Sequence, residues 1–222
     1  MKVLIPARSG SKGIPNKNLI DLNGRPLIFY TINEALKVFA PNSIFVSSDS
    51  DAILAYSKSL GVETIKRPQN ISGDKSTSAQ VINHFIKSLN IIDSCEILYL
   101  QPTSPLRRVK HIKDSIKIYK ATECNSLISV CKSNEYIDKT FILNKNYLEP
   151  LVGSAEYKEI RQDISQTYYP NGAIYIFNSL NFQIDNKIPL TNVVPYIMSR
   201  VDSIDIDDSI DLEYSKTILK VR

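Results

Sequence analysis

The chain has 222 residues, of which 43% are hydrophobic, and a formal net charge of +4 at pH 7. A chain of this length and apolar content is expected to form one domain, residues 1–222, around a full hydrophobic core. The modest charge and the lack of a basic helix with interleaved aromatic side chains argue against a nucleic-acid partner. No stretch approaches the roughly 18 apolar residues of a membrane helix, and the first predicted strand leaves no room for a signal peptide. We therefore expect a cytoplasmic protein without a membrane partner.

The first predicted strand, residues 2–6, is short and apolar, and the loop after it is long and basic. Glycines in this loop alternate with the cationic residues Arg8, Lys12, Lys17 and Arg25. Glycine lets a backbone approach a ligand closely, and a basic loop at the carboxyl end of a first strand suits a polyphosphate. The spacing fits neither GxxxxGK(S/T) nor GxGxxG, so neither a P-loop nor a dinucleotide site is expected. The alternative is an ordinary solvated basic loop.

Strands and helices then alternate along the chain. Strands are predicted at 43–48, 62–66, 97–101 and 126–132, and helices at 28–39, 51–60, 82–89 and 109–119. This order predicts an α/β protein with a mostly parallel sheet covered by helices on both faces, which makes three layers. Ligands of such sheets bind at the carboxyl ends of the strands, where Arg8, Asp49, Arg67 and Gln101 fall. One site could collect all four.

The pattern changes after residue 132. Residues 133–166 are polar and weakly periodic, which predicts an insertion that forms a flap or a dimer arm. The segment 168–177 is expected to return to the sheet through a turn at Asn171-Gly172. A further strand is predicted at 195–199 and a closing helix at 210–221, with Asp208 or Ser209 as its cap.

Asp205-Ile206-Asp207 precedes this last helix. Side chains of an extended segment alternate, so the two carboxylates are expected to share one face. Mg²⁺ is often held by one or two carboxylates together with phosphate oxygens. A solvated acidic turn is the simpler interpretation of the motif alone. With the basic loop, however, the pair predicts the two halves of a nucleoside triphosphate site that uses Mg²⁺ or Mn²⁺.

Four separated regions carry a more specific pattern. They are IPARSGSKGIPNKNL at 5–19, QPTSPLR at 101–107, PNGAIYI at 170–176, and YIMS with DSIDID between 196 and 207. In this order they resemble the bacterial CMP-sialic acid synthetases, the acylneuraminate cytidylyltransferases. The resemblance implies a mononucleotide-binding α/β fold with an inserted dimerisation arm, and hence a homodimer. It also implies a reaction that joins CTP to the anomeric hydroxyl of a nonulosonic acid and releases pyrophosphate.

The resemblance assigns roles to individual residues. The triphosphate side comprises Arg8, Lys12 and Lys17, and the cytosine and ribose side comprises Asn18, Arg67, Ser76 and Ser78. The sugar acid is assigned to Gln101, Lys139 and Arg161, with the last two on its carboxylate, and the metal to Asp205 and Asp207. Arg8, Lys17 and Asp207 are the expected catalytic residues, because nucleotidyl transfer needs charge neutralisation and in-line positioning. The proton of the anomeric hydroxyl is expected to pass to Asp205 or Asp207.

The substrate stays open at this point. Tyr169 precedes Pro170-Asn171-Gly172 where sialic acid enzymes often carry arginine, so legionaminic and pseudaminic acids are alternatives to N-acetylneuraminate. A cytidylyltransferase for 3-deoxy-manno-octulosonate is a further alternative. A sugar 1-phosphate nucleotidyltransferase fits less well, because such enzymes usually place the metal aspartate in mid-chain. A non-catalytic nucleotide-binding regulator is disfavoured, because the basic loop and the carboxylate pair are both present.

Overall fold

The computed structural model describes residues 1–11, 13–134, 140–151 and 166–221. Its centre is a seven-stranded sheet in the order β11-β7-β10-β6-β1-β4-β5. In chain order these strands are β1 (Lys2–Pro6), β4 (Ile44–Ser48), β5 (Glu63–Lys66), β6 (Glu96–Tyr99), β7 (Ser126–Lys132), β10 (Tyr168–Asn178) and β11 (Val193–Met198). Four of the six strand pairings are parallel, and both antiparallel ones involve β10. The predicted mostly parallel sheet is confirmed.

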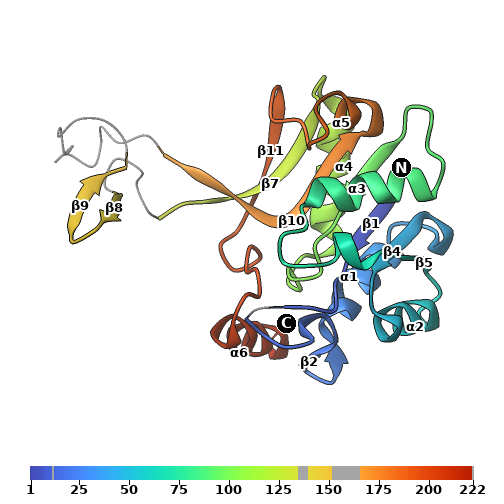
Figure 1. Ribbon diagram of the computed structural model, residues 1–222, viewed down its shortest axis with the longest axis horizontal. Coiled ribbons are helices and arrows are strands. Elements are labelled where there is room, and N and C mark those ends of the chain that lie inside the picture. The colour runs from blue at the N-terminus through green and yellow to red at the C-terminus, as the bar shows by residue number, and fades with distance from the viewer. Residues whose placement is uncertain (12, 135–139, 152–165, 222) are drawn as a thin grey trace.

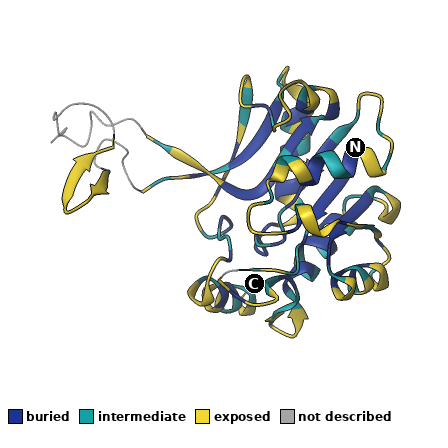
Figure 2. Ribbon diagram, in the orientation of Figure 1, coloured by how far each residue is buried: buried dark blue, intermediate teal, exposed yellow. Residues whose placement is uncertain are grey.

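Helices cover both faces of the sheet, as the alternation of side chains along the strands requires. Val3 and Ile5 of β1 face one core, which also contains apolar residues of α1 (Leu27–Leu36), α2 (Asp51–Ser59) and α4 (Val109–Ala121). Leu4 faces the opposite core, which contains residues of α3 (Ser78–Ser88) and α5 (Ser179–Asp185). Figure 2 shows the sheet buried between these helices. The three predicted layers are therefore present.

A third, smaller core lies beneath the N-terminal loop. It joins the short hairpin of β2 (Asp21–Leu22) and β3 (Arg25–Pro26) to α6 (Ser209–Lys220), and its buried members are Ile14, Leu22, Leu27, Ile206 and Leu212. Asp208 caps α6 by accepting bonds from the backbone N–H groups of Ile210 and Asp211, as predicted. This core brings the start of the chain against the segment that contains the carboxylate pair. Single-turn 3-10 helices also occur at Lys17–Leu19, Pro41–Ser43 and Gln69–Ile71.

The predicted Asn171-Gly172 turn is wrong. β10 runs without interruption through this dipeptide, and its register against β7 shifts between Pro170 and Tyr175. A hairpin turn of the Asn-Gly type needs positive φ at both residues, but only Gly172 has one, at 75°. Asn171 is buried instead, and its amide bonds Ser129 and Ser203. The dipeptide therefore forms a bulge within a strand.

The predicted insertion contains a hairpin of β8 (Phe141–Asn144) and β9 (Tyr147–Pro150). Figure 1 shows it standing away from the sheet, beyond the ends of β7 and β10. All eight of its strand residues are exposed, and the apolar ones include Leu143 at 73%, Tyr147 at 76% and Leu148 at 67%. No helix in the described part of the chain is both long and apolar enough to span a bilayer.

Candidate functional site

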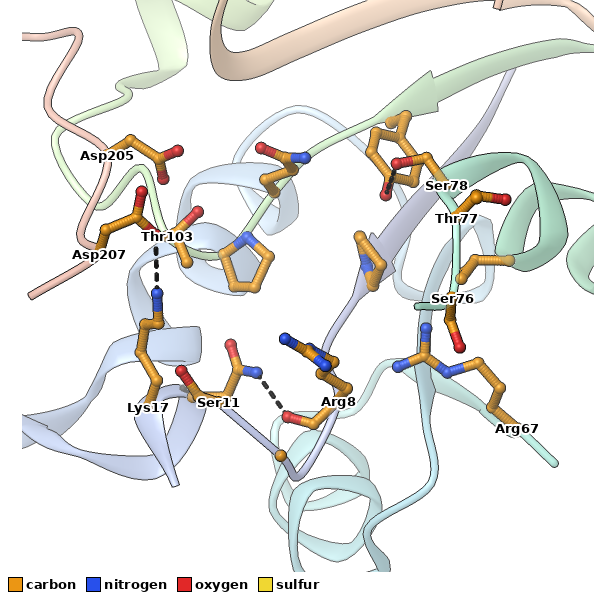
Figure 3. A pocket seen from close by; sticks show the side chains of 17 residues that line it. Arg8, Ser11, Lys17, Arg67, Ser76, Thr77, Ser78, Thr103, Asp205 and Asp207 are labelled. Atoms are coloured by element: carbon orange, nitrogen blue, oxygen red, sulfur yellow. Dashed lines mark hydrogen bonds and ion pairs between the residues drawn. The ribbon is translucent and has the colours of Figure 1, made fainter. Parts of the chain in front are cut away.

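A cavity of about 280 Å³ opens at the carboxyl ends of β1, β5 and β6. Nine of the predicted site residues line it: Arg8, Lys17, Asn18, Arg67, Ser76, Ser78, Gln101, Asp205 and Asp207. Figure 3 shows these side chains converging from the N-terminal loop, the loop before α3, the end of β6 and the segment before α6. The predicted residues Lys12, Lys139 and Arg161 lie outside the residues that the structure describes. Of the four residues expected at strand ends, Asp49 is the one that does not line the cavity.

Asp49 instead fixes the N-terminal loop. Its carboxylate accepts hydrogen bonds from the backbone N–H of Ser9, at 2.9 Å, and from the Ser9 hydroxyl. Burial of Asp49 raises its pKa, but these bonds outweigh burial and hold the pKa below its usual value. Asn18 adds a second tie by donating to the carbonyl of Arg8 at 2.9 Å. The loop is therefore anchored, contrary to the alternative of an ordinary solvated loop.

The same loop is bound to the carboxylate segment. Lys17 Nζ donates to the carbonyl of Ile206 at 2.7 Å and contacts Asp207 Oδ1 at 3.0 Å. A Cβ placed on Gly13 would lie 2.1 Å from the carbonyl oxygen of Asp207. Glycine is needed there because one stretch of backbone packs directly against another. The cations and the carboxylates are thus held as one unit.

The two carboxylates differ in environment. The Asp205 side chain is largely buried, whereas that of Asp207 is 80% exposed. Burial is the main cause that raises the pKa of Asp205, and the neighbouring Asp207 adds to it, while a hydrogen bond with Thr103 acts in the opposite direction. Asp205 Oδ1 is buried and has no hydrogen-bond partner among the described residues. Such an unpaired oxygen needs a cation or a donor from a ligand.

The donor set fits Mg²⁺ or Mn²⁺ carried in by a polyphosphate. Two carboxylates face the cavity, and such ions accept one or two protein carboxylates with phosphate oxygens completing the shell. Within the described residues no group of three or more His, Cys, Asp or Glu side chains could hold a metal by itself. A metal at this site would therefore depend on the substrate for its remaining ligands.

The opposite wall presents unpaired donors. Arg67 is 4% exposed, and its Nε and Nη2 atoms have no partner in the described part of the chain. Burial is the largest influence on Arg67 and lowers its pKa, against the attraction of Asp49. A buried guanidinium without acceptors is costly unless a ligand supplies them. This end of the cavity suits a ligand rich in carbonyl and hydroxyl oxygens.

The side chain of Gln101 lies against Gly172, where a larger residue would not fit. A Cβ on Gly172 would lie 2.4 Å from Gln101 Oε1 and 3.4 Å from Asp205 Oδ2. Beneath them, the fully buried Arg107 donates to the carbonyls of Gln101, at 3.0 Å, and Ala173, at 2.7 Å. Its burial lowers the pKa to about 9, so the guanidinium stays charged at neutral pH.

Sequence reasoning assigned no role to Arg107 or to Thr103, which lines the cavity. Both residues belong to the QPTSPLR segment at 101–107, directly after a predicted strand. An arginine or a threonine at such a strand end can bond neighbouring backbone groups as well as a ligand, and this position could have indicated their roles. For Gly172, the sequence analysis predicted only a place in the Asn171-Gly172 turn. Its close contacts join β10 to two other segments, so no local pattern reveals them.

Gly172→Ala tests this close approach. Gly61 supplies a matched control, because it also has a positive φ, 83° against 75°, but has nothing within 4 Å of an added Cβ. Both alanine variants carry the cost of positive φ, roughly 1–2 kcal/mol. We expect urea denaturation to show a small further loss for Gly172→Ala, because the end of the flexible Gln101 side chain must move. Equal losses in the two variants would contradict the assigned contact.

Asp205→Asn tests the cost of burying the carboxylate. A carboxyl whose pKa is raised on folding destabilises the folded state when pH is above that pKa, and the cost disappears below the unfolded pKa. In metal-free buffer we expect the variant to melt at a higher temperature than the parent protein at pH 7. The difference should vanish near pH 3. A lower melting temperature at pH 7 would show that Asp205 is stabilised by partners in the free protein.

Comparison with known proteins agrees with this geometry. The family model described as "Cytidylyltransferase" matches residues 2–193. An N-acylneuraminate cytidylyltransferase of Streptococcus agalactiae serotype III is 34% identical over 92% of this chain and 49% of its own length. The chain therefore spans about half the length of the first of these curated relatives. A pseudaminic acid cytidylyltransferase of Campylobacter jejuni is 30% identical over 98% of this chain and 95% of its own length.

A solved structure has the same fold. It is a CMP:2-keto-3-deoxy-manno-octonic acid synthetase complexed with CTP, and it superimposes with a TM-score of 0.71 over 99% of this chain and 98% of its own. At 15% sequence identity, this likeness concerns the fold alone. The family match covers most of the chain, and the Campylobacter relative is matched over nearly its whole length. The chain belongs to the cytidylyltransferase family.

Proposed function

We propose that the protein transfers the cytidylyl group of CTP to the anomeric hydroxyl of a nonulosonic, sialic-type acid. The observation that carries this is the cavity itself, where buried unpaired donors at one end oppose two carboxylates and a lysine at the other. The first end suits a pyrimidine and ribose, and the second suits a metal-bound triphosphate. The names of the relatives support a sugar acid as the acceptor.

The reaction forms a bond between the anomeric oxygen and the α-phosphorus and breaks the bond from that phosphorus to the leaving pyrophosphate. Arg8 and Lys17, with Lys12, neutralise the charge that gathers on the departing phosphates. Arg67, Asn18, Ser76 and Ser78 hold the cytosine and ribose. The proton of the anomeric hydroxyl passes to Asp205 or Asp207. When bound by Asp205 and Asp207, Mg²⁺ or Mn²⁺ polarises the phosphate oxygens.

The acceptor is placed on the far side of the carboxylates. Gln101 contacts the sugar, and Lys139 and Arg161 bind the carboxylate that shares a carbon with the reacting hydroxyl. The relatives named for N-acylneuraminate and pseudaminic acid leave both as candidate substrates, with legionaminic acid beside them. The solved synthetase for an octonic acid keeps 3-deoxy-manno-octulosonate as the second candidate.

Pyrophosphate release from CTP, measured with a panel of these acids, tests the function, and Asp207→Asn tests the mechanism. Removing one charge from the metal pair should lower kcat by about a hundredfold or more. The side chain is exposed, so the fold should survive, and the melting temperature checks this. Asp185→Asn is a control, because it makes the same change on an exposed carboxylate of α5. Near-normal turnover of folded Asp207→Asn at ordinary Mg²⁺ would refute the metal assignment.

The protein is also proposed to form a homodimer through the arm. A two-stranded hairpin alone is at best marginally stable in water, and that of β8 and β9 exposes Leu143 and Leu148. A second copy of the chain would cover these side chains.

Sedimentation equilibrium tests the dimer. The wild type should have twice the chain mass of 25.1 kDa at micromolar concentration. Leu148→Arg should sediment mainly as a monomer, because a buried unpaired charge opposes the interface. Ile184→Arg is the control, since Ile184 is 79% exposed on α5. A monomeric wild type would refute the proposal, as would a Leu148→Arg variant that still dimerises fully.

A further inference from the structure

A second cavity, of about 520 Å³, adjoins the first and shares Asp205 with it. Its walls come from the β10 residue Tyr169, from the loop after β11, and from the first turns of α6. The nucleotide and its phosphates, as proposed above, occupy the first cavity. The second therefore begins where the acceptor must present its hydroxyl, on the other side of the Asp205 carboxylate.

The chemistry of this second cavity is mixed. Its lining combines the polar residues Arg200, Tyr169, Tyr214 and Asp211 with the apolar residues Val201 and Ile204. Carboxylates and hydroxyls accept hydrogen bonds from sugar hydroxyls, guanidinium groups donate to carbonyl oxygens, and phenol rings cover the C–H faces of a sugar. A lipid or a flat heterocycle would leave the Arg200 guanidinium without an acceptor. A polyhydroxylated acyl sugar would not.

Among the described residues that line this cavity, Arg200 is the one cation. It forms no ion pair within the described part of the chain, whereas Arg8 is paired with Asp74 and Lys17 with Asp207. Arg200 lies close enough to the Tyr169 hydroxyl to oppose the rise in its pKa, of which burial is the main cause. The guanidinium and the phenol therefore face the same space.

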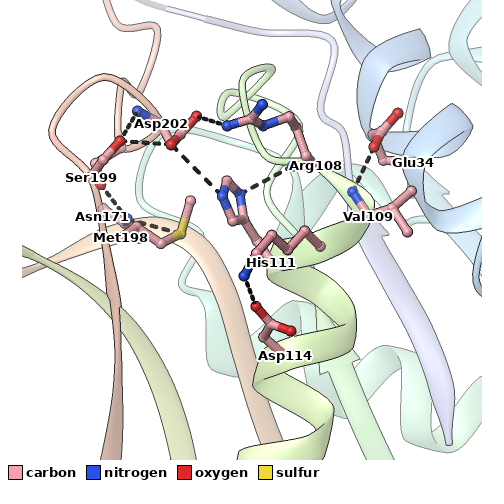
Figure 4. Close-up of polar contacts among 11 residues, drawn as sticks. Glu34, Arg108, Val109, His111, Asp114, Asn171, Met198, Ser199 and Asp202 are labelled. Carbon is pink, nitrogen blue, oxygen red and sulfur yellow. Dashed lines mark hydrogen bonds and ion pairs between the residues drawn. The ribbon is translucent and has the colours of Figure 1, made fainter.

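The loop after β11, which contains Arg200, is held in place by polar contacts of Asp202 and Ser203 (Figure 4). Asp202, 6% exposed, accepts from the Ser199 hydroxyl at 2.6 Å and from Arg108 at 3.4 Å, and His111 Nε2 lies 3.8 Å away. Ser203, 5% exposed, accepts from Asn171 at 2.8 Å.

These contacts tie a loop without regular secondary structure to α4 and to the bulge of β10. A wall held this firmly is preorganised, which reduces the entropy lost when a ligand binds. Burial lowers the pKa of His111, although the charge of Asp202 acts to raise it. The contacts that hold this loop therefore do not depend on a charged imidazole at neutral pH.

Resting on the proposed function, we infer that this second cavity binds the acylamido and hydroxyl substituents of the sugar acid, and that Arg200 selects them by donating to the acyl carbonyl oxygen. The sugar's own carboxylate, on the reacting carbon, lies at the Asp205 end of this cavity and away from Arg200. Arg200 is thus a specificity-determining residue rather than a catalytic one.

The experiment compares Arg200→Ala with wild type in two assays. The first measures kcat/KM by pyrophosphate release for N-acetylneuraminate, a legionaminic acid and a pseudaminic acid, and for the deaminated nine-carbon acid, which keeps the carboxylate but has a hydroxyl in place of the acylamido group. For the best acylated acid, kcat/KM should fall about 10- to 100-fold, as for loss of a hydrogen bond from a charged donor. For the deaminated acid it should fall less than about threefold, and KM for CTP should not change. Lys216→Ala, the same charge change on α6 outside the cavity, should alter none of these values.

The second assay measures binding of the same acids by calorimetry without CTP or metal, so that it does not depend on turnover. The wild type should bind the best acylated acid more tightly than Arg200→Ala does. Equal losses for acylated and deaminated acids would place Arg200 on the carboxylate and overturn the inference, as would unchanged kcat/KM or binding. If the wild type binds acylated acids through Arg200 but releases no pyrophosphate, the proposed function fails while the inference stands. If the wild type binds none of the acids, the inference fails.

Discussion

The site depends on one junction, where the N-terminal loop meets the segment before α6. Lys17 bonds the carbonyl of Ile206 and the carboxylate of Asp207, although 189 and 190 positions separate them in sequence. Gly13 lets the two backbones touch, and Ile14 and Ile206 share a small core beneath. Without this junction the cations and the carboxylates would belong to separate loops. With it, they form one rigid pair of charges whose separation is set before any ligand arrives, which is what electrostatic catalysis requires.

The site is also built at the expense of stability. The Oδ1 atom of the half-buried Asp205 is buried and unpaired, and the buried Arg67 has two unpaired nitrogens in the described part of the chain. Each raises the free energy of the unliganded protein. The buried Arg107 offsets part of this, because its charge lies near Asp205 while its hydrogen bonds hold the ends of β6 and β10. A ligand that pairs these polar atoms removes this cost. Ligand binding should therefore raise the free energy of unfolding strongly.

Local patterns revealed the sheet and its helices, because alternation along strands and helical periodicity both arise from burial of one face. The same logic placed Arg8, Arg67 and Gln101 together, since the ends of parallel strands meet. Local sequence patterns could not predict contacts between segments that are distant in the sequence. The bulge at Gly172 looked like a hairpin turn because Asn-Gly favours both. Only the bond that Asn171 accepts from Ser129 and the one it donates to Ser203 decide between them. The cavity around Arg200 was missed for the same reason, because its walls are separate in sequence.

The place of the arm in the sheet has a consequence for how such proteins can diversify. β7 and β10 are hydrogen-bonded neighbours that run in opposite directions, and the arm is the chain between them. In topological terms the arm is therefore the loop of a long hairpin, however elaborate it becomes. Such a loop can be lengthened, shortened or exchanged without altering the order or direction of any strand, at a cost in closure entropy that grows only slowly with length. Evolution, or a designer, can thus replace the arm as a module while the end of the sheet that lines the first cavity stays unchanged.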